Sequence, residues 1–141
     1  MKGMEKMEPK DDKYLHSEIT NLIFQSFYKV YNGLGIGFEK KHYIKALSIE
    51  LNKLNVKSEI HKRLIIYYEQ IELGEYIADL VVDNKVLISV ETDTEIDSDK
   101  EQFLFTKLRA CELEVGLLLN FGKVPESKRK IYTNDRKKNI S

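Results

Sequence analysis

Acidic side chains occupy every odd position from residue 91 to residue 101, and Lys100 is the only base in that stretch. On one continuous strand these six carboxylates would line one face and repel one another. We therefore expect a strand that ends near Asp93, then a loop, then a helix that begins near Asp97, since helix N-termini favour anions. A solvated acidic loop is the simplest interpretation. A Mg²⁺ site needs only one or two carboxylates, so Glu91 and Asp93 are also candidate metal ligands.

A further carboxylate, Asp79, lies within the apolar run 77–82. A charge there is costly unless a cation, hydrogen-bond donors or a metal compensates it. A three-residue loop at 83–85 would pair Val82 with Val86, Asp79 with Ser89 and Ile77 with Glu91. Asp79 and Glu91 would then be diagonal neighbours, roughly 7 Å apart at the backbone, and one ion could bridge them. A two-residue loop would put them on opposite faces, and an Asp at a strand edge facing water or a lysine is the alternative.

The elements that must position these groups follow from the spacing of apolar residues. Helical spacing predicts helices over 15–31, 38–54 and 98–111. Residues rich in β-branched and aromatic side chains predict strands over 58–68, 71–82 and 85–90, three consecutive antiparallel strands joined by turns. The near-continuous apolar run 114–121 predicts a central parallel strand buried on both faces, and 128–133 a short edge strand. This order predicts an α/β fold, a mixed β-sheet flanked by helices.

Composition limits the function further. The chain has 141 residues, 42% of them hydrophobic, with 23 basic and 23 acidic side chains and one cysteine. This predicts one domain over 14–133, after a flexible tail at 1–13 and before a basic tail at 134–141. The single cysteine excludes an intramolecular disulfide and a multi-cysteine zinc site. No apolar run is long enough to span a bilayer, so we expect an intracellular protein, cytoplasmic or nuclear, with no membrane partner.

The C-terminal stretch 123–141 is basic, with seven Lys and Arg residues against two acids, a net charge of about +5. Lys128, Arg129 and Lys130 are the candidate nucleic-acid-binding residues of this stretch, because basic side chains contact phosphates. A solubilising tail is the alternative interpretation.

Three blocks of this sequence together resemble the GxxExxY proteins of the PD-(D/E)XK nuclease superfamily. They are Gly35-Ile36-Gly37-Phe38 through Tyr43 to Ala46-Leu47, then 73–80, then 115–122. The similarity covers roughly residues 15–133, in the same order and with compatible spacing. The resemblance implies a restriction-endonuclease-like core, Mg²⁺ at paired carboxylates and phosphodiester hydrolysis.

Only some of the motif and metal-binding residues of that family are present at the matching positions of this sequence. Gly37 and Tyr43 match the naming motif, but its central Glu falls on Lys40. Asp79 matches the metal-binding Asp. The remaining substitutions are as follows: the family's Glu-x-Lys falls on Ser89-Val90-Glu91, and the expected helical Gln falls on Phe103.

Two hypotheses follow from this exchange of a lysine and a carboxylate. In the first, Asp79 and Glu91, with Asp93, hold one Mg²⁺ and Lys40 is the cationic helper of a rearranged nuclease, or an insertion lets 91–93 act as Glu-x-Asp. In the second, Lys40 and Glu91 form an ion pair, no metal binds, and the domain is a pseudo-nuclease that binds nucleic acid or a protein partner. We favour the second, because substitution at four of five expected positions is more simply explained by loss.

Overall fold

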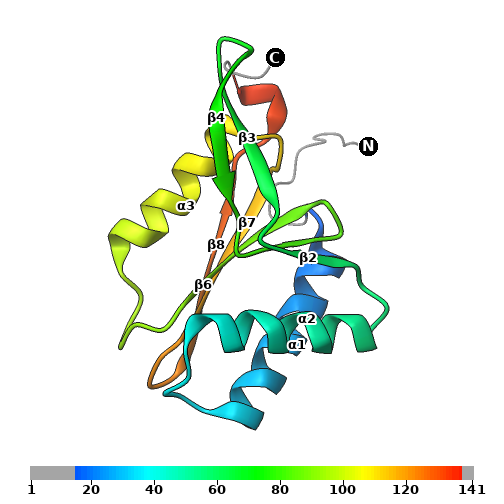
Figure 1. The fold of residues 1–141 in the computed structure, drawn as a ribbon, viewed down its shortest axis with the longest axis vertical. Coiled ribbons are helices and arrows are strands. Elements are labelled where there is room, and N and C mark those ends of the chain that lie inside the picture. The colour runs from blue at the N-terminus through cyan, green and yellow to red at the C-terminus, as the bar shows by residue number, and fades with distance from the viewer. Residues whose placement is uncertain (1–14, 138–141) are drawn as a thin grey trace, which may run out of the picture.

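The computed structural model describes residues 15–137, and within them the main sheet has five strands in the order β2-β5-β6-β7-β8 (Figure 1). The helices are α1 (Ser17–Leu34), α2 (Lys40–Lys53) and α3 (Ser98–Ala110), with a 3-10 turn, η2 (Asn134–Arg136). The strands are β2 (Ser58–Ile60), β3 (Arg63–Tyr68), β4 (Ile71–Ile77), β5 (Leu80–Val82), β6 (Val86–Glu91), β7 (Val115–Phe121) and β8 (Pro125–Ile131). The predicted α/β fold, a mixed sheet flanked by helices, is confirmed.

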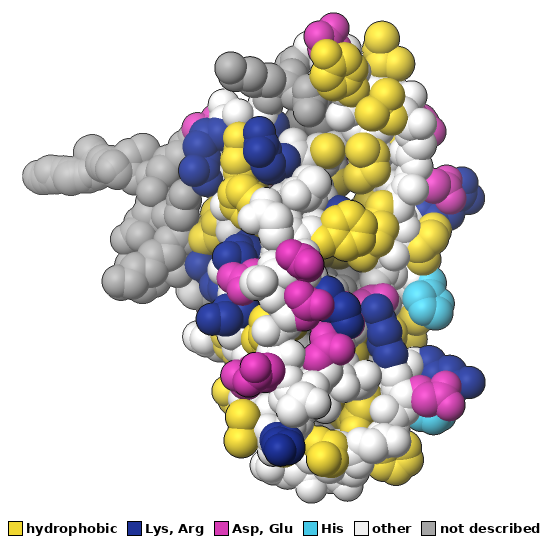
Figure 2. Space-filling view, turned by 90° about the vertical axis from the view of Figure 1, so that its left-hand side faces the viewer, with side chains coloured by type: hydrophobic (Ala, Val, Ile, Leu, Met, Phe, Trp, Pro, Cys, Tyr) yellow, Lys and Arg dark blue, Asp and Glu magenta, His cyan; other side chains and the backbone are white. Residues whose placement is uncertain are grey.

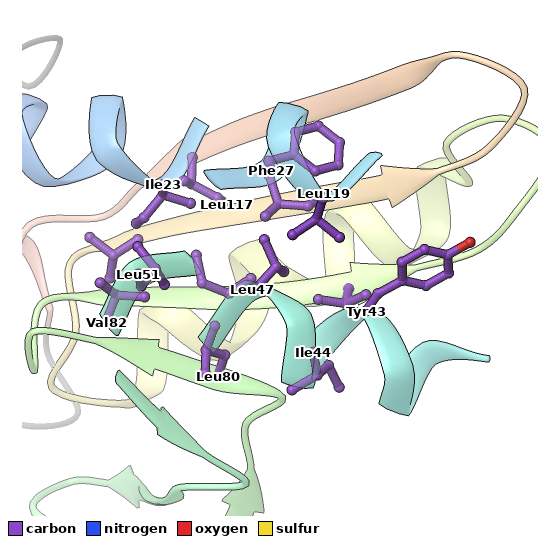
Figure 3. Packing of buried hydrophobic residues seen from close by; sticks show 14 of the residues in the cluster. Ile23, Phe27, Tyr43, Ile44, Leu47, Leu51, Leu80, Val82, Leu117 and Leu119 are labelled. Carbon is purple, nitrogen blue, oxygen red and sulfur yellow. The ribbon is translucent and has the colours of Figure 1, made fainter. Parts of the chain in front are cut away.

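The two faces of the sheet carry separate hydrophobic clusters because side chains alternate along each strand. Helices α1 and α2 cover one face, where Phe27 and Leu47 pack against strand residues such as Leu117 (Figure 3). Helix α3 covers the other face, with Leu104 and Leu108 in contact with the second cluster. The sheet is therefore buried on both sides at its centre.

Strand β7 lies between β6 and the edge strand β8, and all seven of its residues are buried. It pairs in parallel with β6 and antiparallel with β8, and α3 makes the crossover between the two parallel strands. The predictions of a buried parallel strand over 114–121 and of an edge strand after it are confirmed, although β8 begins earlier than expected. The predicted helix over 98–111 is also present, and the Asp97 side chain caps it by accepting a hydrogen bond from Asp99 N at 2.8 Å.

The predicted strands over 58–68, 71–82 and 85–90 do pair antiparallel in chain order, but the first two are not continuous. Each of the first two predicted strands is interrupted, so that β3 and β4 form a separate two-stranded hairpin, drawn at the top of Figure 1. His61, at the first break, has a left-handed backbone (φ 56°), and Asp79 lies at the second break. The two breaks lie opposite each other, since His61 N donates to Asp79 O at 3.2 Å. The strands therefore change direction together.

The register between β5 and β6 agrees with the three-residue loop, the first of the two loop lengths considered from the sequence. Val82 pairs with Val86, and Asp83 and Asn84 both adopt the left-handed conformation that a tight hairpin loop requires (φ 53° and 55°). The predicted pair of Ile77 with Glu91 is wrong, because Ile77 belongs to the hairpin and pairs with Arg63.

Candidate functional site

Asp79 lies at the break between β4 and β5 and points toward β6. Its Oδ2 accepts a hydrogen bond from the backbone N of Val90 at 2.8 Å, so the carboxylate caps the strand edge where regular pairing has stopped. Glu91, at the end of β6, lines the same cleft. The structure therefore brings the two predicted carboxylates together.

Lys40, in the first turn of α2, reaches across to these carboxylates. Its Nζ lies 3.1 Å from Asp79 Oδ2 and 4.0 Å from Glu91 Oε2. The side chain of Lys40 is 43% exposed, whereas those of Asp79 and Glu91 are 13% and 15% exposed. The ammonium group therefore covers the two carboxylates from the solvent side and compensates their charge.

The loop before α2 fixes the start of the helix, and hence the direction of Lys40. Gly37 has φ 106°, a conformation that side chains other than that of glycine rarely adopt. The hydroxyl of Tyr43 donates to Gly35 O at 2.7 Å, and its ring stacks on Phe121 of β7 with centroids 4.0 Å apart. The two matching positions of the naming motif, Gly37 and Tyr43, thus have structural roles, while the substituted position carries the charge.

Lys100 also lines the cleft, although the sequence did not predict it as a site residue. Its Nζ lies 3.1 Å from Glu91 Oε1 and 2.8 Å from Asp93 Oδ2. Its hydrogen bond to Asp93, followed by that to Glu91, raises the pKa of Lys100. The only signal in the sequence was its position as the only base of the acidic stretch.

The acidic segment that follows β6 is fixed by β7. Buried Asn120 accepts from Asp93 N at 2.9 Å and donates to Asp93 O at 3.0 Å. A Cβ atom at Gly122 would lie 2.5 Å from the carbonyl oxygen of Asp93, so only glycine allows this close approach. Asp93 is thereby held beside Lys100 rather than left in a solvated loop.

Lys107 is the second lysine of α3 that the sequence analysis missed as a site residue. It is only 8% exposed, and its Nζ lies 3.8 Å from the centre of the Tyr76 ring and 2.8 Å from that of Phe103. Burial lowers the pKa of the Lys107 ammonium to about 8. Burial, with the nearby charges of Asp79 and Glu91, raises the pKa of Tyr76 to about 12.

Together these groups form a cleft of about 250 Å³ between α2, α3 and the base of the hairpin. Its lining residues are Lys40, Tyr76, Ile77, Asp79, Ser89, Glu91, Lys100, Phe103, Leu104 and Lys107. Three ammonium groups therefore face two carboxylates.

The donor set does not fit a Mg²⁺ ion, which prefers oxygen ligands. Both oxygens of Glu91 lie near donors: Oε1 near Lys100, and Oε2 near Lys40 and Ser89 Oγ. Both oxygens of Asp93 accept from Lys100. Within residues 15–137 no three His, Cys, Asp or Glu side chains gather in a way that would suit a metal ion. The ammonium groups of Lys40 and Lys100 already lie beside the carboxylates, where a bound metal ion would have to lie.

Two of the three basic residues predicted to bind nucleic acid contact other parts of the chain. Lys130 forms an ion pair with Glu101, and Arg129 Nη2 donates to Leu15 O at 2.6 Å. Lys128 is exposed. From the same C-terminal stretch, Lys137 is buried and donates to two backbone carbonyls, so it does not contribute to a basic surface.

Comparisons with known proteins give one match. A family model for the PD-(D/E)XK nuclease superfamily matches residues 17–132, most of the chain. No curated protein and no solved structure matches. Nucleases of this superfamily usually use Mg²⁺. Among residues 15–137, none of the helices has the length and apolar character needed to cross a membrane.

Proposed function

Because the chain belongs to the PD-(D/E)XK nuclease superfamily, we propose that it is a non-catalytic member, a pseudo-nuclease whose fold serves binding. The observation that supports this is the pairing of Lys40 with Asp79 and of Lys100 with Glu91 and Asp93. Placement among the GxxExxY proteins is part of the same proposal, and it is supported by Gly37 and Tyr43.

Electrostatics explains why these pairs oppose catalysis. A divalent ion would have to displace two ammonium groups that already neutralise the carboxylates, and each displaced lysine would then lie close to the metal's positive charge. Without the metal, the charge that develops on a phosphate would find Lys40 and Lys100 already paired with carboxylates, and no divalent ion to stabilise it. The paired lysines therefore oppose binding of the metal on which phosphodiester hydrolysis depends in this superfamily.

The surface favours a protein over a nucleic acid as the partner. The hairpin β3–β4 exposes Tyr68, Ile71 and Leu73, each more than half accessible to solvent. Figure 2 shows hydrophobic side chains gathered in the upper part of one face, above a mixed group of acidic and basic side chains. Exposed apolar patches mark protein interaction sites. The hairpin also carries Glu69 and Glu72, which would repel phosphates, and the formal net charge of the chain is zero.

The competing hypothesis is a Mg²⁺-dependent nuclease that uses Asp79, Glu91 and a relocated Lys40. It is favoured by one observation, the position of both carboxylates and Lys40 in a single cleft. The test is incubation of the full chain with single- and double-stranded DNA and RNA, with Mg²⁺ or Mn²⁺, beside the variant Asp79→Ala. We expect no cleavage above background with either protein. Metal-dependent cleavage that disappears in Asp79→Ala would overturn the proposal.

The binding function is tested in the same samples. We expect the full chain not to bind DNA or RNA at about 0.15 M salt. Salt-dependent binding that falls in Lys128→Ala would instead assign a nucleic-acid partner. The matched hairpin variant Leu73→Ser should leave the fold intact, since its side chain is exposed, and should weaken capture of a partner protein.

A further inference from the structure

Lys107 differs from the other lysines in the part of the chain that the structure describes. Lys137 is the other buried lysine, and it donates two hydrogen bonds, to Cys111 O at 2.8 Å and to Leu113 O at 2.7 Å. Among residues 15–137, Lys107 makes neither a hydrogen bond nor an ion pair, and its Nζ lies over the rings of Tyr76 and Phe103. It also borders an open cleft.

Such an arrangement is costly if its only role is structural. An amine that is mostly shielded from water and has no protein acceptor loses part of its hydration, and two aromatic faces compensate for this loss only in part. The charged groups around it come from every neighbouring element: Lys40 on α2, Asp79 before β5, Glu91 on β6 and Lys100 on α3. The carboxylates are already paired with the other two lysines, so Lys107 is the amine that remains for a ligand.

The surroundings of Lys107 favour the free amine. Burial is the largest cause that lowers its pKa, to about 8, and Lys40 lowers it further, while Asp79 and Glu91 act in the opposite direction. A desolvated lysine near another cation is the arrangement in which lysines act as nucleophiles toward carbonyl compounds. At neutral pH the fraction of free amine at Lys107 is on the order of a hundred times that of an exposed lysine.

We propose that Lys107 is a carbonyl-reactive amine and that the cleft beside it takes small neutral aldehydes as imines. The lone pair of the uncharged Nζ attacks the carbonyl carbon, and a proton transfers from nitrogen to oxygen to give a carbinolamine. Loss of one water molecule then forms the C=N bond. The step needs no oxidant, reductant or metal, and it does not rest on the proposed loss of nuclease activity.

The walls of the cleft select the class of aldehyde. Phe103, Tyr76 and Leu104 present apolar surface near the amine. An anionic aldehyde would meet Asp79 and Glu91, whose charges Lys40 and Lys100 offset without a surplus. A neutral aromatic aldehyde avoids this repulsion and can pack against the rings.

The experiment uses the full chain, benzaldehyde below one equivalent, and sodium cyanoborohydride, which reduces an imine to a stable secondary amine. Peptide mass spectrometry locates the modified lysines at pH 7. We expect Lys107 to be modified roughly tenfold faster than the exposed lysines Lys57 and Lys128. Its rate should rise through pH 8, and its advantage should shrink near pH 10, where the exposed lysines also lose their protons.

Two controls make the outcome decisive. Lys107→Arg keeps the cation but removes the primary amine, and it should abolish the fast modification. Lys137 also has a pKa lowered by burial, but it donates to backbone carbonyls and does not line the cleft, so it should stay unmodified. Modification of Lys107 at or below the rate of Lys57 and Lys128 would overturn the proposal. So would equal modification of Lys137, because a lowered pKa would then suffice without the cleft.

Discussion

The cleft and the C-terminal end of the described chain hold lysines in opposite ways. Lys137 is 2% exposed and donates to two main-chain carbonyls just after α3, where the neutral peptide groups of Cys111 and Leu113 hold it. In the cleft, Lys40 and Lys100 are partly exposed and pair with carboxylates, and the Nζ of Lys107 beside them lies over aromatic rings.

The environment of Lys137 is typical of a residue that stabilises the fold, whereas the environment of the cleft lysines is typical of a functional site. Lys137 gives a donor to two carbonyls that follow the end of α3, which stabilises the fold. The cleft concentrates five charged groups in a small volume, where half-exposed ion pairs contribute little to stability. An arrangement that costs more than it stabilises is typical of functional sites.

The largest expected effect comes from restoring the family's residues in the cleft. The variant Lys40→Glu/Ser89→Glu/Glu91→Lys places carboxylates at the family's Glu positions and a lysine at its Lys position. We expect Mg²⁺ affinity to rise by on the order of tenfold or more, because the carboxylates would face a site without Lys40. Isothermal titration calorimetry measures it. Adding Asp79→Ala should abolish the gain, and equal Mg²⁺ binding by the unmodified protein would contradict the comparison.

The next effect concerns Lys137. Lys137→Met should lower the free energy of unfolding by about 1–3 kcal/mol, because it leaves the buried carbonyls of Cys111 and Leu113 without their donor. Urea unfolding measures it. The matched control is Lys128→Met at an exposed position, which should change stability by no more than about 0.5 kcal/mol.

Lys107 should respond to pH in the opposite sense from an ordinary ion pair. Its folded pKa of about 8 lies below the ordinary 10.5, so protonation below pH 8 opposes folding. Between pH 8 and pH 10.5 the unfolded chain binds more protons at this lysine than the folded chain does. As pH rises through this range, the wild-type protein should therefore gain stability relative to Lys107→Met. Parallel urea titrations at pH 7 and pH 10 measure the difference. This assignment would be contradicted if the free energy of unfolding of Lys107→Met fell relative to that of the wild type as pH falls from 10 to 7.

Much of the architecture could be predicted because its signals are local. The apolar run 114–121 has the length typical of a buried strand, and the Asp-Asn pair at 83–84 is typical of a tight loop. The β5–β6 register was not fixed by the sequence, because a two-residue loop was an alternative to the three-residue loop that the structure has. The break at His61 was not predictable, since a left-handed histidine within an apparently continuous strand depends on the hairpin that twists away from the sheet.

The site was predictable only where one strand or one motif determined it. Asp79, Glu91 and Lys40 follow from strand alternation and from the aligned motif. The contacts of Lys100 and Lys107 depend on how α3 lies against the sheet, which is set by close packing of Leu104 on Gly116, where an added Cβ would lie 3.0 Å away. A distance between a helix and a sheet leaves no periodic signal in the sequence.

The smallest expected effect is that of Lys100, and it sharpens the contrast with Lys137. Its side chain is 39% exposed, so water and salt screen its attraction to Glu91 and Asp93. Lys100→Met should therefore lower the free energy of unfolding by less than about 1 kcal/mol, and the difference should fade in about 1 M NaCl. Urea unfolding at low and high salt measures both. A salt-independent loss as large as that of Lys137→Met would place Lys100 among the residues that hold the fold together, and the cleft would then be a structural feature.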